Sequence, residues 1–196
     1  MKIFKKLTLL AIGLSALLAL TGCDKTPQDT KQPPGASRVP ASGVYDLVAA
    51  KASGFSVGNM MATRVVYVMF DAQCPHCGRL WQTSKPLLGQ IRMVWAPVRF
   101  AGDISERQGA TLLAAKEPVG DMDAHERSLE AKRGGLVPPA EIPAEFVAKV
   151  KANTELMAEI GADTVPFLVF KNSANGQSTT FAGALETEDL KKLLGL

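Results

Sequence analysis

The sequence predicts an α/β fold in a single domain, and three features support this prediction. Val65 to Phe70 (VVYVMF) is an unbroken apolar run, which is typical of a strand buried on both faces of a parallel sheet. A helix is expected from Pro75, and Ile91 to Val98 predicts the next strand, so these elements would close a right-handed β-α-β unit. About 150 residues lie beyond the N-terminal segments, enough for one hydrophobic core.

The helix after residue 74 is predicted by the spacing of its apolar side chains. Pro75 suits the first helical position, where a missing N–H group removes no hydrogen bond, and Pro86 is expected to kink the helix. Trp81 and Trp95 are both expected in the core. The inward stripe is expected to contain Leu80, Trp81, Ser84, Leu87, Leu88 and Ile91.

Helices are predicted before and after this unit. Val44 to Ser53 is expected to form one, and residues 105–160 are expected to form a helical insertion. Ser105 and Gln108 have the spacing of a capping box at a helix start. His125 lies in the charged segment DMDAHERSLEAKR, which indicates a solvated helix face.

The C-terminal part predicts two strands and a closing helix. Asn175-Gly176 is a hairpin signal between the strands Pro166–Phe170 and Gln177–Phe181. Thr187 to Leu194 is expected to be a helix, with three leucines facing the core: Leu190, Leu193 and Leu194.

Residues 1–22 are predicted to be a signal peptide. Three lysines precede the apolar run Leu7–Leu20, which is short for a membrane span of about 20 apolar residues. The run ends in Leu20-Thr21-Gly22-Cys23, which resembles the lipobox of bacterial lipoproteins. That resemblance implies lipidation of Cys23, attachment to a membrane, and, from Asp24, retention in the inner membrane. The alternative is a plain signal peptide with a chance cysteine.

Residues 23–43 are predicted to be a flexible, lipid-anchored tether. They are rich in Pro, Thr, Ser and Lys and contain almost no apolar side chains, so they cannot bury enough surface to order themselves. The folded domain is therefore expected at residues 44–196.

The charge balance excludes one class of function. The chain has 22 Lys and Arg residues against 19 Asp and Glu residues, and the surplus lies entirely in the predicted signal peptide, at Lys2, Lys5 and Lys6. The remainder has no basic excess, so binding of nucleic acid through a global positive charge is not expected.

The remaining two cysteines, Cys74 and Cys77, form the motif Cys-Pro-His-Cys. A disulfide across so short a loop removes little chain entropy, so the pair suits redox chemistry better than structural cross-linking. Cys74 is expected at a helix N-terminus, where free N–H groups and the helix dipole stabilise a thiolate. His76 would add a hydrogen bond or positive charge. Asp71 would act in the opposite direction by raising a thiol pKa.

The order strand, Cx2C at a helix start, kinked helix and strand resembles the thioredoxin fold. The stretches VVYVMFDAQCPHCGRLWQ, ATLLAAKEP and GADTVPFLVF resemble the catalytic domain of the periplasmic DsbC and DsbG disulfide isomerases. The Cys-Pro-His-Cys sequence, and Val before Pro166, match the oxidase DsbA instead. The expected fold is therefore thioredoxin-like, with a helical insertion before a cis-proline strand.

The resemblance also implies roles for residues outside the cysteine motif. Pro166 would be cis and would pack against the cysteines, while Thr164 and Val165 would offer backbone groups to an extended substrate. Cys74 would be the nucleophile and Cys77 the resolving cysteine. No N-terminal dimerisation domain of the isomerases is visible before the predicted core, so a monomer is expected.

These features predict a periplasmic thiol:disulfide oxidoreductase that oxidises reduced or unfolded secreted proteins and is recycled by a membrane redox partner. No cofactor or metal is expected. Three alternatives remain open. The chain could work as a reductase or isomerase of the DsbC and DsbG type, it could carry copper or zinc on the two cysteines and a histidine, or it could be a non-catalytic lipoprotein with a structural disulfide.

Overall fold

The computed structural model describes residues 40–196. The predictions for the signal peptide, for Cys23 and Asp24, and for the tether up to residue 39 lie outside the described residues. The tether was predicted to reach residue 43, but Ala41–Gly43 form a short 3-10 helix, η1, that contacts the edge of the sheet. The ordered part therefore begins slightly earlier than its composition indicates.

A five-stranded mixed sheet forms the centre of the fold, in the order β1-β3-β2-β4-β5. The apolar run predicted as a strand is β2 (Val65–Phe70), which lies in the middle and is almost fully buried. It runs parallel to β3 (Arg92–Pro97), as predicted, and antiparallel to β4 (Phe167–Lys171). The edges are β1 (Phe55–Gly58), which the sequence did not predict, and β5 (Ser178–Ala182).

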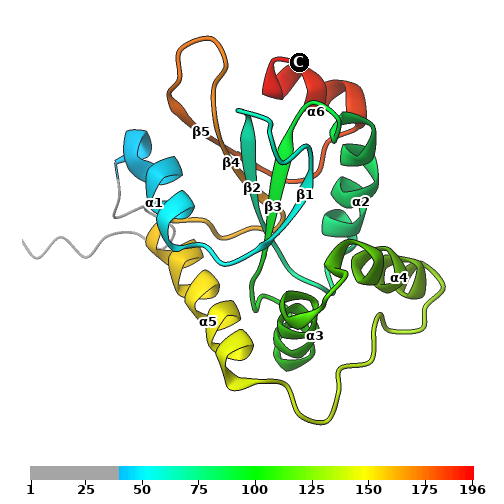
Figure 1. Cartoon of the computed structure of the whole chain (residues 1–196). Coiled ribbons are helices and arrows are strands. Elements are labelled where there is room, and N and C mark those ends of the chain that lie inside the picture. The colour runs from blue at the N-terminus through cyan, green and yellow to red at the C-terminus, as the bar shows by residue number, and fades with distance from the viewer. Residues whose placement is uncertain (1–39) are drawn as a thin grey trace, which may run out of the picture. The chain divides into compact units, whose positions relative to one another are not determined.

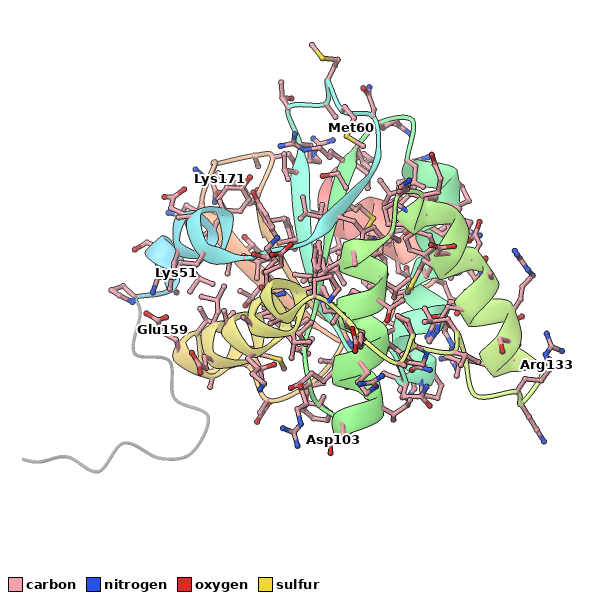
Figure 2. The ribbon with its side chains drawn as sticks, turned by 60° about the horizontal axis from the view of Figure 1, so that its bottom comes forward. Lys51, Met60, Asp103, Arg133, Glu159 and Lys171 are labelled. Atoms are coloured by element: carbon pink, nitrogen blue, oxygen red, sulfur yellow. The ribbon has the colours of Figure 1, made fainter. Side chains whose placement is uncertain are left out.

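Helices cover both faces of this sheet (Figure 1). The helices α2 (Pro75–Ser84) and α6 (Thr187–Leu194) lie together on one face. The helices α1 (Val44–Lys51) and α5 (Ala144–Glu159) lie on the other, where the side chains of Lys51 and Glu159 form an exposed ion pair of 3.0 Å (Figure 2). Exposed pairs of this kind add little stability, so the layers are held mainly by apolar burial.

The buried side chains confirm the predicted stripe of α2. Pro86 does not kink a continuous helix, because α2 ends at Ser84 and a 3-10 turn, η2 (Lys85–Leu87), continues the chain. Trp81 and Trp95 are buried as predicted, with ring centroids 5.1 Å apart in an edge-to-face contact. Phe55 and Phe70 complete an aromatic cluster between α2 and the sheet.

The predicted helical insertion lies between β3 and β4. It consists of α3 (Asp103–Ala114), α4 (Pro118–Glu130) and α5, and Figure 1 shows α3 and α4 at one end of the sheet. The capping box predicted for Ser105 and Gln108 is wrong. Gly102 is the N-cap of α3. Ser105 and Gln108 lie further along the helix, where their buried side chains donate hydrogen bonds to the Asp71 carboxylate and the Gly134 carbonyl, respectively.

The C-terminal elements agree with their predictions. β4 and β5 pair antiparallel around Asn175-Gly176, where Gly176 has a φ of 70°, a backbone conformation that favours glycine. The helix Thr187–Leu194 is α6. Its side chains of Leu190 and Leu194 are buried, and that of Leu193 is partly buried.

Candidate active site

Cys74 lies at the junction of β2 and α2. It lies four residues after the end of the strand, its backbone is extended (φ −86°, ψ 116°), and it forms the N-cap of the helix. Its carbonyl oxygen accepts hydrogen bonds from the N–H groups of Cys77 at 3.0 Å and Gly78 at 3.2 Å. Pro75 occupies the first turn, as predicted. The Cys74 sulfur therefore lies beside the N–H groups of the first helical turn, those of His76 and Cys77.

These neighbours lower the pKa of Cys74 from 9.0 to about 6. The hydrogen bond from the thiol of Cys77 has the largest effect, while partial burial acts in the opposite direction. The backbone N–H groups of Cys77 and His76, and then the charge of the His76 side chain, lower it further. Near pH 7 the thiolate is therefore the main form of Cys74.

Cys77 has the opposite environment. Its side chain is fully buried, and burial raises its pKa, followed by the hydrogen bond to Cys74 and the charge of Cys74. Asp71 acts on the pKa of Cys77 in both directions: a hydrogen bond with its backbone lowers it, and the charge of its carboxylate, a smaller effect, raises it. One turn of helix thus separates a reactive thiolate from a thiol that holds its proton.

The loop before β4 lies against Cys74. The peptide bond between Val165 and Pro166 is cis, as the resemblance implied, and Pro166 is buried. The Cys74 sulfur lies 3.6 Å from the carbonyl oxygen of Val165, to which it can donate only while it is protonated. Thr164 is exposed, and its hydroxyl donates to the carboxylate of Asp163. The structure therefore brings the backbone of Val165 to the cysteine motif.

Asp71 holds the loop that precedes Cys74. Its carboxylate is buried and accepts four hydrogen bonds. One oxygen accepts from the N–H of Gln73 at 2.7 Å and the hydroxyl of Ser105 at 2.8 Å. The other accepts from the N–H groups of Phe100 and Ala101, both at 2.8 Å. The carboxylate therefore joins the cysteine loop to the start of α3.

The prediction that His125 lies on a solvated helix face is wrong. Its ring is fully buried, and burial lowers its pKa. Nε2 lies 2.6 Å from the carbonyl oxygen of Ala72, and Nδ1 accepts from the N–H of Leu136 at 3.0 Å. Because one partner only accepts and the other only donates, the ring is neutral with its proton on Nε2. His125 therefore fastens α4 to the cysteine loop.

Glu126, the next residue, is a second buried group that the sequence did not indicate. Its carboxylate lies against the Cα atom of Gly78, so a side chain at position 78 would collide with it. Burial raises its pKa to about 7, with smaller contributions from the charges of Glu130 and Cys74. The only sequence signal was glycine directly after the cysteine motif, which permits close approach of another segment.

Within residues 40–196, no three His, Cys, Asp or Glu side chains lie together in a way that could hold a metal ion. In the same range, no helix is both long and apolar enough to cross a membrane.

The sequence is similar to two proteins named thiol:disulfide interchange protein DsbG. The protein of Pseudomonas aeruginosa is 33% identical over 140 residues, which is 70% of this chain and 54% of the relative. That of Escherichia coli is 28% identical over 123 residues, 60% of this chain and 48% of the relative. The chain therefore spans about half the length of the curated relatives it matches. No protein-family model matches it.

Solved structures share the fold at low sequence identity. A periplasmic thioredoxin-like protein of Salmonella enterica superposes with a TM-score of 0.62 at 14% identity, covering 78% of this chain and 94% of that one. Proteus mirabilis ScsC in a transitional conformation gives 0.63 at 19% identity, covering 80% and 78%. The thiol-disulfide exchange protein α-DsbA2 of Wolbachia pipientis gives 0.60 at 17%, covering 79% and 94%. The chain therefore has a thioredoxin-like fold, and its sequence is similar to those of thiol:disulfide interchange proteins.

Proposed function

We propose that this chain is a thiol:disulfide oxidoreductase of the periplasm, with Cys74 as the nucleophile and Cys77 as the resolving cysteine. The observation that carries this proposal is the opposite environment of the two sulfurs. Cys74 is half-buried with a pKa of about 6, whereas Cys77 is fully buried with a raised pKa. A pair of this kind can receive attack at one sulfur and release the other.

The exchange follows from this asymmetry. In the oxidised pair, a client thiolate attacks the Cys74 sulfur, the bond between Cys74 and Cys77 breaks, and Cys77 leaves with the electron pair and takes up a proton. A second client thiolate then attacks the client sulfur of the mixed disulfide. Cys74 leaves as the thiolate that its surroundings stabilise, and two electrons have passed from the client to the protein.

The low pKa of Cys74 supports oxidation as the direction of the reaction. Stabilising the thiolate stabilises the reduced pair, and a stable reduced form makes the disulfide a stronger oxidant. His76 contributes through both its N–H group and its side chain. The proposed clients are reduced or unfolded exported proteins, and a membrane redox partner would reoxidise the pair.

Three residues are proposed to hold the client beside Cys74. The carbonyl oxygen of Val165 already lies within reach of the sulfur, and exposed Thr164 precedes it. An extended client segment could pair with this backbone, as in strand addition. Pro166 has no N–H group and no charge, so it can lie near the sulfurs without competing for them.

The proposal includes membrane attachment through a lipid on Cys23 and a monomeric state. The lipobox-like sequence before Cys23 supports the first. Mass spectrometry of the mature N-terminus and membrane fractionation test the anchor, and light scattering in detergent tests the oligomeric state.

The direct test is oxidation of a reduced, unfolded substrate protein by the full-length chain. Wild-type protein with its pair oxidised should introduce disulfides, and Cys74→Ser should abolish this activity. Cys77→Ser is the matched control: it cannot form the disulfide and so should not oxidise the reduced substrate, but it retains the nucleophile and should form a mixed disulfide when the substrate is supplied with its own disulfides intact. Retained oxidation by Cys74→Ser would overturn the proposal.

A reductase or isomerase role is the second candidate, because the similar curated sequences are named DsbG. The two roles predict different resting states of the pair in cells. An oxidant should be recovered mainly as the disulfide after rapid thiol trapping, whereas a reductase or isomerase should be recovered as the dithiol.

A further inference from the structure

A cavity of about 460 Å³ opens beside the cysteine motif, between α2 and α4. Pro75, the residue that follows Cys74, lines this cavity. The cavity therefore lies next to the site where a client would react. Its wall is formed from one face of each helix, and the residues that matter here are Pro75, Gly78 and Arg79 of α2 and Glu126, Leu129 and Glu130 of α4.

Glu126 is the buried polar group of this cavity. Its side chain is 4% exposed, and its carboxylate reaches the backbone of Gly78. Among the described residues 40–196, no hydrogen bond or ion pair joins this carboxylate to another group. Asp71, the other buried acid nearby, accepts four hydrogen bonds. The Glu126 oxygens are not among the fully enclosed unpaired polar atoms of residues 40–196, so they open onto the cavity, where a partner from outside the chain can reach them.

The surroundings of Glu126 favour a cation as that partner. Glu130 adds negative charge in both redox states, and the Cys74 thiolate adds more when the pair is reduced. Arg79 lines the cavity from α2 with an exposed side chain, and in the described part of the chain it pairs with neither glutamate. A lysine or arginine side chain suits such a cavity, because its aliphatic stem can pack on Leu129 and Pro75 while its charge meets the carboxylate.

We propose that the cavity between α2 and α4 is a subsite for a lysine or arginine side chain close to the reacting cysteine of a client, with Glu126 as its anion. This inference rests on the proposed function and names a class of client within it. Recognition would then need two contacts, the backbone of Val165 on one side of Cys74 and the cavity on the other.

The subsite predicts a specific pH dependence. The groups that face Glu126 are Cys74 and Arg79 from the side of α2 and Glu130 from α4. Because the pKa of Glu126 is about 7, a bound cation must displace a proton below that pH but not above it. Preference for a basic client should therefore increase between pH 6 and pH 8. In the oxidised protein Cys74 is part of the disulfide and does not titrate, so it adds no pH dependence to the ratio of the two rates.

The test compares two dithiol peptides that differ at one position, two or three residues from a cysteine, with lysine in one and acetyl-lysine in the other. Their oxidation by the full-length, oxidised protein should differ about tenfold at pH 8 in favour of lysine, and much less at pH 6. Glu126→Gln should remove the preference at every pH. Glu130→Gln, at the exposed rim, should retain most of it.

A second measurement does not depend on turnover. The carboxyl pKa of Glu126, followed by NMR, should fall when a cysteine-free lysine peptide is added, and should not fall with the acetyl-lysine peptide. If neither dithiol peptide is oxidised but this pKa falls, the subsite stands and the proposed function fails. If both are oxidised equally at all pH values, or if the preference survives Glu126→Gln, the inference fails and the proposed function stands.

Discussion

Cys74 and Cys77 are chemically identical side chains one helical turn apart, but their environments shift their pKa values in opposite directions. Cys74 is half-buried at the N-cap and receives hydrogen bonds from a thiol and from backbone N–H groups, whereas Cys77 points into the core. The sequence allowed the prediction of this contrast, because Pro75 starts the helix and the apolar stripe orients it. The Cys-Pro-His-Cys motif gave no indication of Glu126, because the position of Glu126 depends on how α4 packs on Gly78.

Alkylation of Cys74 should follow the ionisation of a thiol with a pKa of about 6. The rate with iodoacetamide, measured on the reduced full-length protein, should rise with a midpoint near pH 6. His76→Ala should move this midpoint upward but leave it well below 9, because the hydrogen bond from Cys77 and the backbone N–H groups remain. A wild-type midpoint near 9 would contradict the assigned environment of Cys74.

Glu126→Gln should stabilise the protein above pH 7. The folded state raises the pKa of Glu126 from 4.5 to about 7, so wild-type stability is fully present below pH 4.5 and declines as the pH rises through 7. At pH 8 the variant should gain up to about 3 kcal/mol in free energy of unfolding, and near pH 4 the two proteins should be similar. Urea denaturation measures this, with Glu141→Gln as control, because Glu141 is exposed and does not contribute to the pKa shift of Glu126. Equal stabilities at pH 8 would show that Glu126 is not held in an unfavourable environment.

At the scale of elements, the loop Asp71–Gln73 depends on contacts from the helical insertion. Asp71 binds the start of α3, and His125 of α4 binds the carbonyl of Ala72. An unbroken apolar run predicted β2, a hairpin signal predicted β4 and β5, and the helical spacing of apolar side chains predicted α2 and α6. The predictions for Ser105 and His125 were wrong, since a polar side chain that binds a distant partner, here the Asp71 carboxylate and the Ala72 carbonyl, has the same local sequence pattern as one that faces water.

Asp71→Asn should lower the free energy of unfolding by about 2–4 kcal/mol, because the amide NH2 group cannot accept the hydrogen bonds that one carboxylate oxygen accepts. Thermal and urea unfolding measure this loss. Asp103→Asn is a suitable control, since its carboxylate is 84% exposed and pairs only with Arg99, so its effect should be within about 0.5 kcal/mol. A change at Asp71 no larger than at Asp103 would mean that the buried network does not hold the loop.

For the whole molecule, the redox state should be linked to stability. The fold lowers the pKa of Cys74 from 9.0 to about 6, and this stabilisation exists only while both thiols are free. It should therefore increase as the pH rises from 6 towards 9, and be lost as the pH falls through 6. The melting temperature of the reduced protein minus that of the oxidised protein should accordingly be larger at pH 8 than at pH 5.5. A difference that is constant across this range would contradict the assignment.

The reduction potential of the Cys74–Cys77 pair tests the central claim most directly. Equilibration of the full-length protein with glutathione buffers, followed by separation of the oxidised and reduced forms, measures it. A thiolate stabilised as described predicts a potential on the oxidising side of about −180 mV, towards the value of about −120 mV found for strong oxidants. A potential of about −200 mV or below would contradict oxidation as the direction of the reaction, and would assign the pair to reduction or isomerisation instead.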